Sequence, residues 1–126
     1  MEKKLVTVPG APAPLGPYSP CVEIGNLVYT SGQLGTDAAG NLGADVKEQT
    51  RLSLGNVKAL LNAAGCDMCD IVKSLVFIKD MNDFAAVNEV YAELMTGDVM
   101  PARSCVEVAR LPKDALVEIE VIALKK

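Results

Sequence analysis

The sequence has no histidine, no tryptophan, and only three tyrosines and two phenylalanines among its 126 residues. Without histidine, the common zinc ligand sets, the Ser-His-Asp triad and the Cys-His nucleophile pair are excluded. The side chain best suited to proton transfer near neutral pH is missing as well. Any reaction must therefore use carboxylate, guanidinium, thiol, phenol, hydroxyl or backbone groups, together with bound water.

Clustered positive charge is also missing. The chain has 12 basic and 16 acidic residues, a formal net charge of −4, and the basic residues are scattered along the sequence. Binding to nucleic acid needs clustered Lys and Arg against the phosphates, and single-stranded RNA usually adds aromatic stacking platforms. We therefore do not expect nucleic acid as the main partner.

No apolar run approaches the roughly 18–20 residues that cross a membrane. Lys3 and Lys4 are not followed by the apolar stretch of a signal peptide. We expect a cytoplasmic protein with reduced thiols and no membrane contact. Because half of the residues are hydrophobic and 22% are charged, we also expect one folded domain spanning residues 1–126, with a real core.

Periodicity and turn residues predict an α+β fold. Gly25-Asn26 signals a tight hairpin, and residues 32–43 read as a loop. Asp45 and Glu48 resemble a capping box at the start of a helix that ends at Gly65. The predicted strands are 3–8, 21–24, 27–31, 71–79, 103–108 and 117–124. The second predicted helix starts near Asn82 and ends by Gly97, burying Phe84, Val87, Tyr91, Leu94 and Met95. The simplest packing is a mixed, mostly antiparallel sheet of about six strands with two helices on one face.

The last two strands carry the most informative pattern. Strand alternation points Arg103, Cys105 and Glu107 to one side of residues 103–108. In residues 117–124 the same alternation separates Glu118 and Glu120 from an apolar face. We predict that Arg103, Cys105 and Glu118 share the sheet face that the helices leave open. A face that mixes charges with aliphatics favours a closed homo-oligomer with polar clefts between subunits.

At these residues the chain resembles the RidA/YjgF family of reactive-intermediate deaminases (Rid proteins) over nearly its whole length. The longest match is the fourteen-residue signature at 101–114, which Glu118-Ile119-Glu120 completes. The other matching motifs are Gly16-Pro17-Tyr18-Ser19, Thr30-Ser31-Gly32-Gln33, the segment 56–61 and the segment 77–84. Two departures are Pro20, where the family usually has a polar residue, and a short 96–100 connection without an aromatic. Both lie near the expected rim of the cleft, where they bear on substrate range rather than on the central chemistry.

The resemblance implies a chorismate-mutase-like α+β fold and a homotrimer with clefts between subunits. It implies hydrolysis of enamine and imine intermediates, such as 2-aminoacrylate and 2-iminopropanoate, to 2-keto acids and ammonia, without a metal or organic cofactor. By position, Arg103 would bind the substrate carboxylate, Cys105 would act at the same cleft and Glu118 would place the water. Tyr18, Ser31, Gly32 and Asn88 would shape the pocket.

Simpler interpretations of these residues stay open. Arg103 and a glutamate on one sheet face are more often a structural ion pair than a site. Cys105 is either a nucleophile whose pKa Arg103 lowers or a small buried hydrophobe whose backbone makes the contact, and we favour the second. Tyr18 can serve packing alone, Ser31 can cap the loop, and Asn88 can tie down a backbone group.

The Cys66–Cys69 pair has the C-x-x-C spacing of metal and redox motifs. Zinc would need two further ligands, and with no histidine only Cys21 and Cys105 remain. We interpret the pair as two incidental thiols in a loop.

Three classes of function fit these residues. The first is an enamine/imine deaminase, a 2-iminobutanoate/2-iminopropanoate deaminase in the family's terms. The second is a non-catalytic binder or sensor of small carboxylates such as 2-keto acids. The third is the ribonuclease or translation-inhibitor role of some relatives, against which the acidic charge and the missing histidine count.

Overall fold

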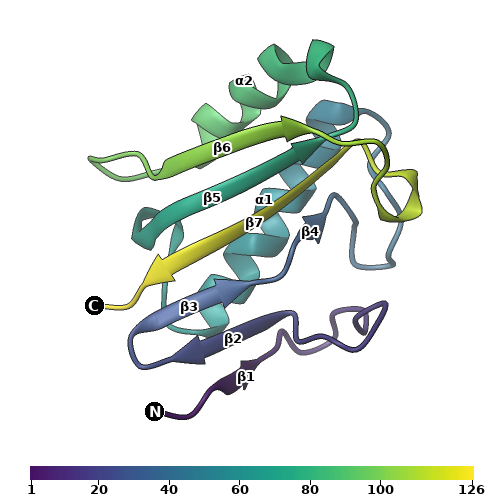
Figure 1. The fold of residues 1–126 in the computed structure, drawn as a ribbon. Coiled ribbons are helices and arrows are strands. Elements are labelled where there is room, and N and C mark those ends of the chain that lie inside the picture. Colours follow the sequence, from purple (N-terminus) through teal and green to yellow (C-terminus); the bar gives the residue numbers. More distant parts are fainter.

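The computed structural model describes residues 1–126, which form seven strands and two α-helices (Figure 1). The strands are β1 (Lys4–Val6), β2 (Cys21–Ile24), β3 (Leu27–Thr30), β4 (Gln33–Leu34), β5 (Ile71–Ile78), β6 (Ala102–Glu107) and β7 (Val117–Leu124). The helices are α1 (Val46–Ala63) and α2 (Phe84–Leu94), with 3₁₀ turns at Met68–Asp70, Met81–Asp83 and Pro112–Asp114. Neither helix is long and apolar enough to span a membrane.

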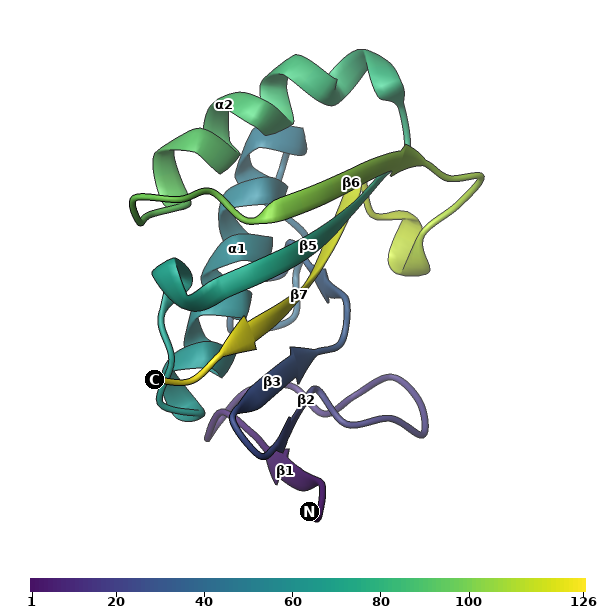
Figure 2. The ribbon, with the colours of Figure 1, turned by 60° about the vertical axis from the view of Figure 1, so that its left-hand side comes forward.

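All strands belong to one sheet in the order β1-β2-β3-β7-β5-β6, and β4 pairs with β7. Only β5 and β6 run parallel, so the sheet is mixed and mostly antiparallel, as predicted. Both helices lie on the same face of this sheet (Figure 2), which confirms the predicted layer arrangement. The expected loop at 32–43 is partly wrong, because it contains β4 and a bridge between Thr36 and Leu42.

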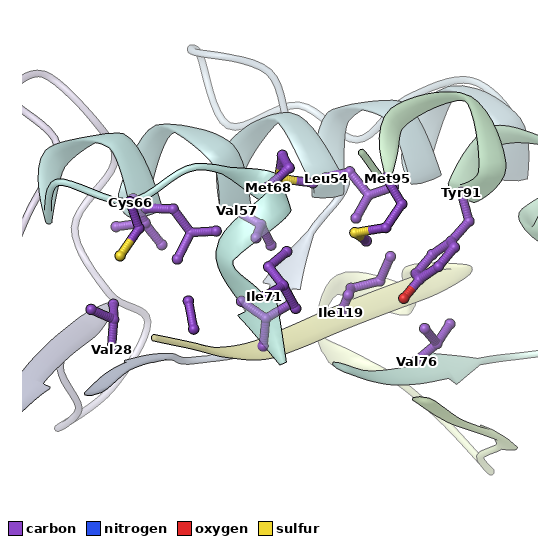
Figure 3. Packing of buried hydrophobic residues seen from close by; sticks show 14 of the residues in the cluster. Val28, Leu54, Val57, Cys66, Met68, Ile71, Val76, Tyr91, Met95 and Ile119 are labelled. Atoms are coloured by element: carbon purple, nitrogen blue, oxygen red, sulfur yellow. The ribbon is translucent and has the colours of Figure 1, made fainter. Parts of the chain in front are cut away.

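The core lies between the helices and the sheet. It is a cluster of 19 buried residues that includes Leu54, Val57 and Leu61 of α1 and alternate residues of β7 (Figure 3). The alternation in β7 is clean, with Val117, Ile119, Val121 and Ala123 at most 2% exposed. Burial of this aliphatic surface is the main term that stabilises the fold.

The start of α1 follows the predicted cap only in part. Asp45 Oδ1 accepts the Glu48 N–H at 2.8 Å, as an N-cap should. The reciprocal bond of a capping box is missing, because Glu48 Oε2 accepts from the Ala44 N–H at 3.3 Å instead. The predicted end is confirmed, since Gly65 follows the helix in the left-handed region with φ of 86°.

The second helix differs from its prediction in which residues it buries. Val87, Val90 and Tyr91 are buried, but Phe84 is 38% exposed and Leu94 is half-buried. Phe84 was expected in the core because its position fits the apolar stripe. It is the first residue of α2, and its ring lies over the Arg103 guanidinium of the edge strand β6 rather than in the core.

Candidate functional site

The Arg103 side chain lies on the helix-covered side of the sheet, under α2. Its Nη1 donates a hydrogen bond of 2.8 Å to Asn88 Oδ1. Its guanidinium carbon lies 4.8 Å from the centre of the Tyr91 ring and 5.6 Å from that of Phe84. Phe84, Asn88 and Tyr91 are spaced i, i+4 and i+7, so they form a single stripe on one face of α2.

No carboxylate neutralises this guanidinium. Of the three arginines, Arg51 and Arg110 are exposed and each pairs with an acidic side chain. Arg103 is half-buried, and no acidic oxygen of the chain lies within 4.0 Å of it. Aromatic faces and a neutral amide stabilise its charge without cancelling it. The interpretation of Arg103 as half of a structural ion pair is therefore wrong, because its charge has no acidic partner within the chain.

The prediction that Arg103, Cys105 and Glu118 share the open sheet face is wrong. In the parallel pairing, Arg103 and Cys105 align with the buried residues Ser74 and Val76 on the helix side. Glu118 lies on the opposite side, because it alternates with the core residues Val117 and Ile119. Alternation separates the two faces of β6, and the charges on one of them favour solvent exposure for that face. Helix α2 covers the charged side of that strand.

Glu118 lies against the break between β3 and β4. Tyr29 pairs with Ile122 and Gln33 pairs with Ile119, so one extra residue is accommodated between them, as in a β-bulge. Thr30 Oγ1 accepts the Val121 N–H there at 3.0 Å. A β-carbon on Gly32 would stand 2.6 Å from Glu118 Cδ, so only glycine lets this carboxyl group lie so close to the chain. Burial, and then the Glu120 carboxylate, raise the pKa of Glu118 above its usual range.

Ser31 ties this break to the N-terminal segment. Its hydroxyl donates a 2.6 Å hydrogen bond to the Ser19 carbonyl, and its N–H donates to the Pro20 carbonyl. Ser31 therefore makes the loop-capping hydrogen bonds that were one of its two predicted roles. Tyr18 in the same segment is 48% exposed, and its Oη accepts the Leu15 N–H at 3.2 Å.

A cavity of about 780 Å³ opens between residues 5–20, the loop after β4 and the outer face of α1. Tyr18 and Gly32 line this cavity, whereas Arg103, Asn88 and Cys105 do not. The predicted site residues therefore fall into two groups within one chain. Arg103, Asn88 and Cys105 lie under α2, and Glu118, Gly32, Ser31 and Tyr18 lie around the β3–β4 break.

Cys105 does not have the environment of an activated thiol. It is half-buried and packs against the core. Burial raises the pKa of its thiol, and the opposing influence of Arg103 is smaller. The geometry thus favours the interpretation of Cys105 as a small apolar side chain over that of a nucleophile.

The remaining thiols form no disulfide and belong to no group of metal ligands. No group of three or more Cys, Asp or Glu side chains could hold a metal ion. All four cysteines are free, and only Cys69 is exposed. Burial, and then Cys66 and Glu23, raise the pKa of the Cys21 thiol to about 11.

Sequence reasoning missed the aromatic surroundings of Arg103. Phe84 and Tyr91 were assigned to the core, and Ser74, whose Oγ lies 2.7 Å from Tyr91 Oη, was not singled out. The signal was present, since Phe84, Asn88 and Tyr91 share a helical stripe. What the sequence could not show was that β6 would lie under that stripe.

The fold and these residues define a small α+β protein with a half-buried arginine that has no acidic partner. The model of the endoribonuclease L-PSP family matches residues 9–125. The 2-iminobutanoate/2-iminopropanoate deaminase of Escherichia coli K12 is 51% identical in an alignment of 126 positions that covers 98% of this chain and 98% of that protein. The chain therefore belongs to this family, the RidA/YjgF family whose motifs its sequence shares.

Solved structures agree with this assignment. Escherichia coli TdcF, crystallised with bound serine, is 48% identical, with a TM-score of 0.92 over 98% of this chain and 99% of that one. RidA from the Antarctic bacterium Psychrobacter sp. is 42% identical, with a TM-score of 0.92 over 96% of this chain and 98% of that one. The predicted chorismate-mutase-like fold of the family is confirmed by these matches.

Proposed function

We propose that this protein is a deaminase that hydrolyses 2-imino acids and their enamine tautomers to 2-keto acids and ammonia. The observation that carries the proposal is the half-buried Arg103 guanidinium without an acidic partner. The full-length similarity to the Escherichia coli deaminase for 2-iminobutanoate and 2-iminopropanoate supports the substrate class.

Arg103 is suited to bind the carboxylate that every such substrate carries. Asn88 accepts from Nη1, and no other hydrogen bond of this guanidinium occurs within the chain. The remaining N–H donors can thus form two parallel bonds to a carboxylate, a geometry that lysine cannot match. Because Asn88 and two rings already fix the guanidinium, little side-chain entropy is lost when the substrate binds.

The chemical step needs a placed water molecule rather than a strong nucleophile. A protonated imine carbon is electrophilic, and water adds to it to give a carbinolamine. Glu118 accepts a proton from the attacking water and returns it to the nitrogen. As the C–N bond breaks, the hydroxyl oxygen forms the C=O bond, and its proton passes to Glu118 and then to the departing ammonia, which is released as ammonium. Positioning of this kind supplies on the order of 7–11 kcal/mol in ideal cases. This is enough for a substrate that already hydrolyses slowly in water.

The two groups of site residues can meet only between copies of the chain. Arg103 and Glu118 lie on opposite sides of one sheet. One copy of the chain would therefore supply Arg103, and a neighbouring copy would supply Glu118. The open face favours such contact, because it exposes Leu5, Tyr29, Val106 and Leu124 by 38–63%. We propose a homotrimer, the assembly that the family resemblance implies. Sedimentation should give three times the chain mass of 13.3 kDa.

The name of the matching family, endoribonuclease L-PSP, suggests ribonuclease activity as a second function. Its physical support here is weak, because the chain is acidic and lacks the histidine that most metal-free ribonucleases would use. RNA cleavage that persists in Arg103→Ala after careful purification would favour this second function.

The test measures ammonia and keto-acid release when the protein is added to a dehydratase that generates 2-aminoacrylate. Arg103→Ala should lower kcat/KM by about 100-fold, since each charge-assisted hydrogen bond contributes about 1.5–3 kcal/mol. Arg103→Lys keeps the positive charge but loses the paired N–H donors of the guanidinium. Its activity should therefore lie between those of Arg103→Ala and the wild-type protein. Arg110→Ala is the matched control, because it removes an exposed arginine outside the site.

Two results would contradict the proposal. In the first, the wild-type protein leaves the decay of 2-aminoacrylate unchanged. In the second, Arg103→Ala is as active as Arg110→Ala. Tight binding of pyruvate without any turnover would instead indicate the non-catalytic carboxylate sensor.

A further inference from the structure

Tyr91 connects the Arg103 guanidinium to the core of the sheet. Its ring centre lies 4.8 Å from the guanidinium carbon, and the side chain is only 7% exposed. Its hydroxyl group lies 2.7 Å from Ser74 Oγ, and Ser74 is fully buried. Figure 3 shows Tyr91 reaching from α2 with its hydroxyl group directed at the sheet.

Ser74 is placed to anchor this ring at the level of Arg103. Ser74 of β5 and Arg103 of β6 are paired neighbours in the parallel register. The two residues therefore stand side by side on the same sheet face, and Tyr91 reaches both of them from above. One end of the Tyr91 side chain is fixed by the helix and the other by β5, so the ring face toward the guanidinium has little freedom to turn.

This arrangement matters because the Arg103 charge has no acidic partner. A ring face attracts a cation through its quadrupole, and it leaves the N–H donors at the guanidinium edge free for other bonds. An acidic residue at the same place would hold the guanidinium equally well, but it would compete with the substrate carboxylate. The ring can orient the anchor without occupying it.

We propose that Tyr91 is a positioning residue for substrate binding, and that its hydrogen bond with Ser74 holds the ring where it fixes Arg103. Neither residue contacts the substrate in this scheme, because both act through the guanidinium. The kinetic part of the inference rests on the proposed deaminase function, whereas the effect on the guanidinium itself does not.

The first experiment compares Tyr91→Phe, Ser74→Ala and the double variant. We measure kcat and KM in the coupled deaminase assay and the Kd for pyruvate by calorimetry. Each single variant should raise KM and Kd by up to about tenfold, the range of one buried hydrogen bond, with a smaller change in kcat. A carboxylate anchor acts in the ground state and the transition state alike, so its misplacement shows mainly in KM.

The double variant separates a shared bond from two independent effects. Each single change leaves the other hydroxyl group buried and unpaired, while the double change removes both. If the two side chains act through one bond, KM in the double variant is no higher than in the worse single variant. Thr50→Val is the matched control, since it removes another fully buried hydroxyl group whose partner is the Val46 carbonyl. It should lower Tm without changing KM or Kd.

The second experiment observes the guanidinium without any ligand. Only three arginines are present, so the Nε–Hε NMR signal of Arg103 can be assigned by comparison with Arg103→Lys. In the wild-type protein the Tyr91 ring should shift this signal, and the shift should be lost in Tyr91→Leu and reduced in Ser74→Ala. These signals do not depend on activity, so they test the positioning even if the wild-type protein proves not to be a deaminase.

The inference is overturned if the Arg103 signal is the same in Tyr91→Leu, Ser74→Ala and wild type. It is equally overturned if Tyr91→Phe and Ser74→Ala lower Tm while KM and Kd keep their wild-type values. In that case Tyr91 would be a core residue that merely satisfies its hydroxyl group.

Discussion

The carboxyl group of Glu118 occupies the space that a β-carbon at Gly32 would need. A β-carbon at Gly32 would lie 2.6 Å from Glu118 Cδ and 2.7 Å from its Oε1, closer than real β-carbons approach such atoms. The contact joins the β3–β4 break to β7, so the position of this carboxylate depends on a residue that has no side chain.

Gly32→Ala should therefore displace Glu118 and lower kcat more than it raises the KM for the imino acid. The expected loss in kcat is about 10–100-fold, the range for a misplaced general base. Gly55→Ala is the matched control, because nothing lies within 4 Å of a β-carbon there. That change should stabilise α1 by about 0.5–1 kcal/mol. Equal activity of the two variants would show that the Glu118 position does not matter.

Asn88→Asp tests whether the charge of Arg103 must stay unpaired. The substitution is nearly isosteric and places a carboxylate oxygen where Asn88 Oδ1 now accepts from Arg103 Nη1 at 2.8 Å. The new ion pair should preserve Tm while it raises KM and the Kd for pyruvate by about tenfold or more, because the substrate must compete with it. Asn88→Ala removes the bond without adding charge, so it should raise KM less. An Asn88→Asp protein with wild-type KM would contradict this role of the amide.

Several parts of the fold could be predicted from the sequence alone, but the arrangement of the site could not. The hairpin at Gly25-Asn26, the helix end at Gly65 and the burial of alternate β7 residues follow from local rules, and the structure confirms them. The placement of the site residues on opposite faces of the sheet could not be predicted from these rules. Alternation separates the two faces of a strand, but it does not show which face a helix distant in sequence will cover. Helix α2 covers the Arg103 side of β6, and nothing within residues 102–107 encodes that.

The pH dependence of kcat/KM should report the carboxyl group of Glu118. Burial and the Glu120 carboxylate raise its pKa, and the base must be ionised to accept a proton from water. Activity should therefore fall on the acid side with a midpoint above the ordinary value for glutamate, about 4.3. Glu120→Gln removes one of the two causes, so this midpoint should move to lower pH. Glu93→Gln, which removes a carboxylate paired with Arg51 on the helix layer, should leave it in place.

The raised pKa of Glu118 also predicts how the stability of the fold changes with pH. A carboxyl group whose pKa is raised in the folded state stabilises the fold at low pH, and that contribution is lost as pH rises through the folded-state pKa. Glu118→Gln resembles the protonated form, so it should raise Tm at pH 7 and have little effect near pH 4. A Tm difference that is the same at both pH values would contradict the raised pKa.

Cys105 should prove dispensable for the chemistry. Burial raises the pKa of its thiol, so it is protonated at neutral pH and a poor nucleophile. Cys105→Ala should keep kcat within a few-fold of wild type, and iodoacetamide should modify the exposed Cys69 first. Mass spectrometry of the alkylated protein identifies the site. A loss of more than about 100-fold in kcat for Cys105→Ala would restore the thiol as a participant.

Mixing two inactive variants tests whether Arg103 and Glu118 serve a cleft between subunits. Arg103→Ala and Glu118→Ala each remove one half of the site, and the two halves lie on opposite sides of the sheet. In a closed ring, each cleft takes Arg103 from one subunit and Glu118 from its neighbour. After the two proteins are unfolded and refolded together in equal amounts, about one quarter of the clefts should contain both intact residues. The coupled assay should then recover about a quarter of wild-type activity, while each variant refolded alone stays inactive. If the mixture is as inactive as its parents although mass spectrometry detects mixed oligomers, Arg103 and Glu118 do not serve a common cleft between neighbouring subunits.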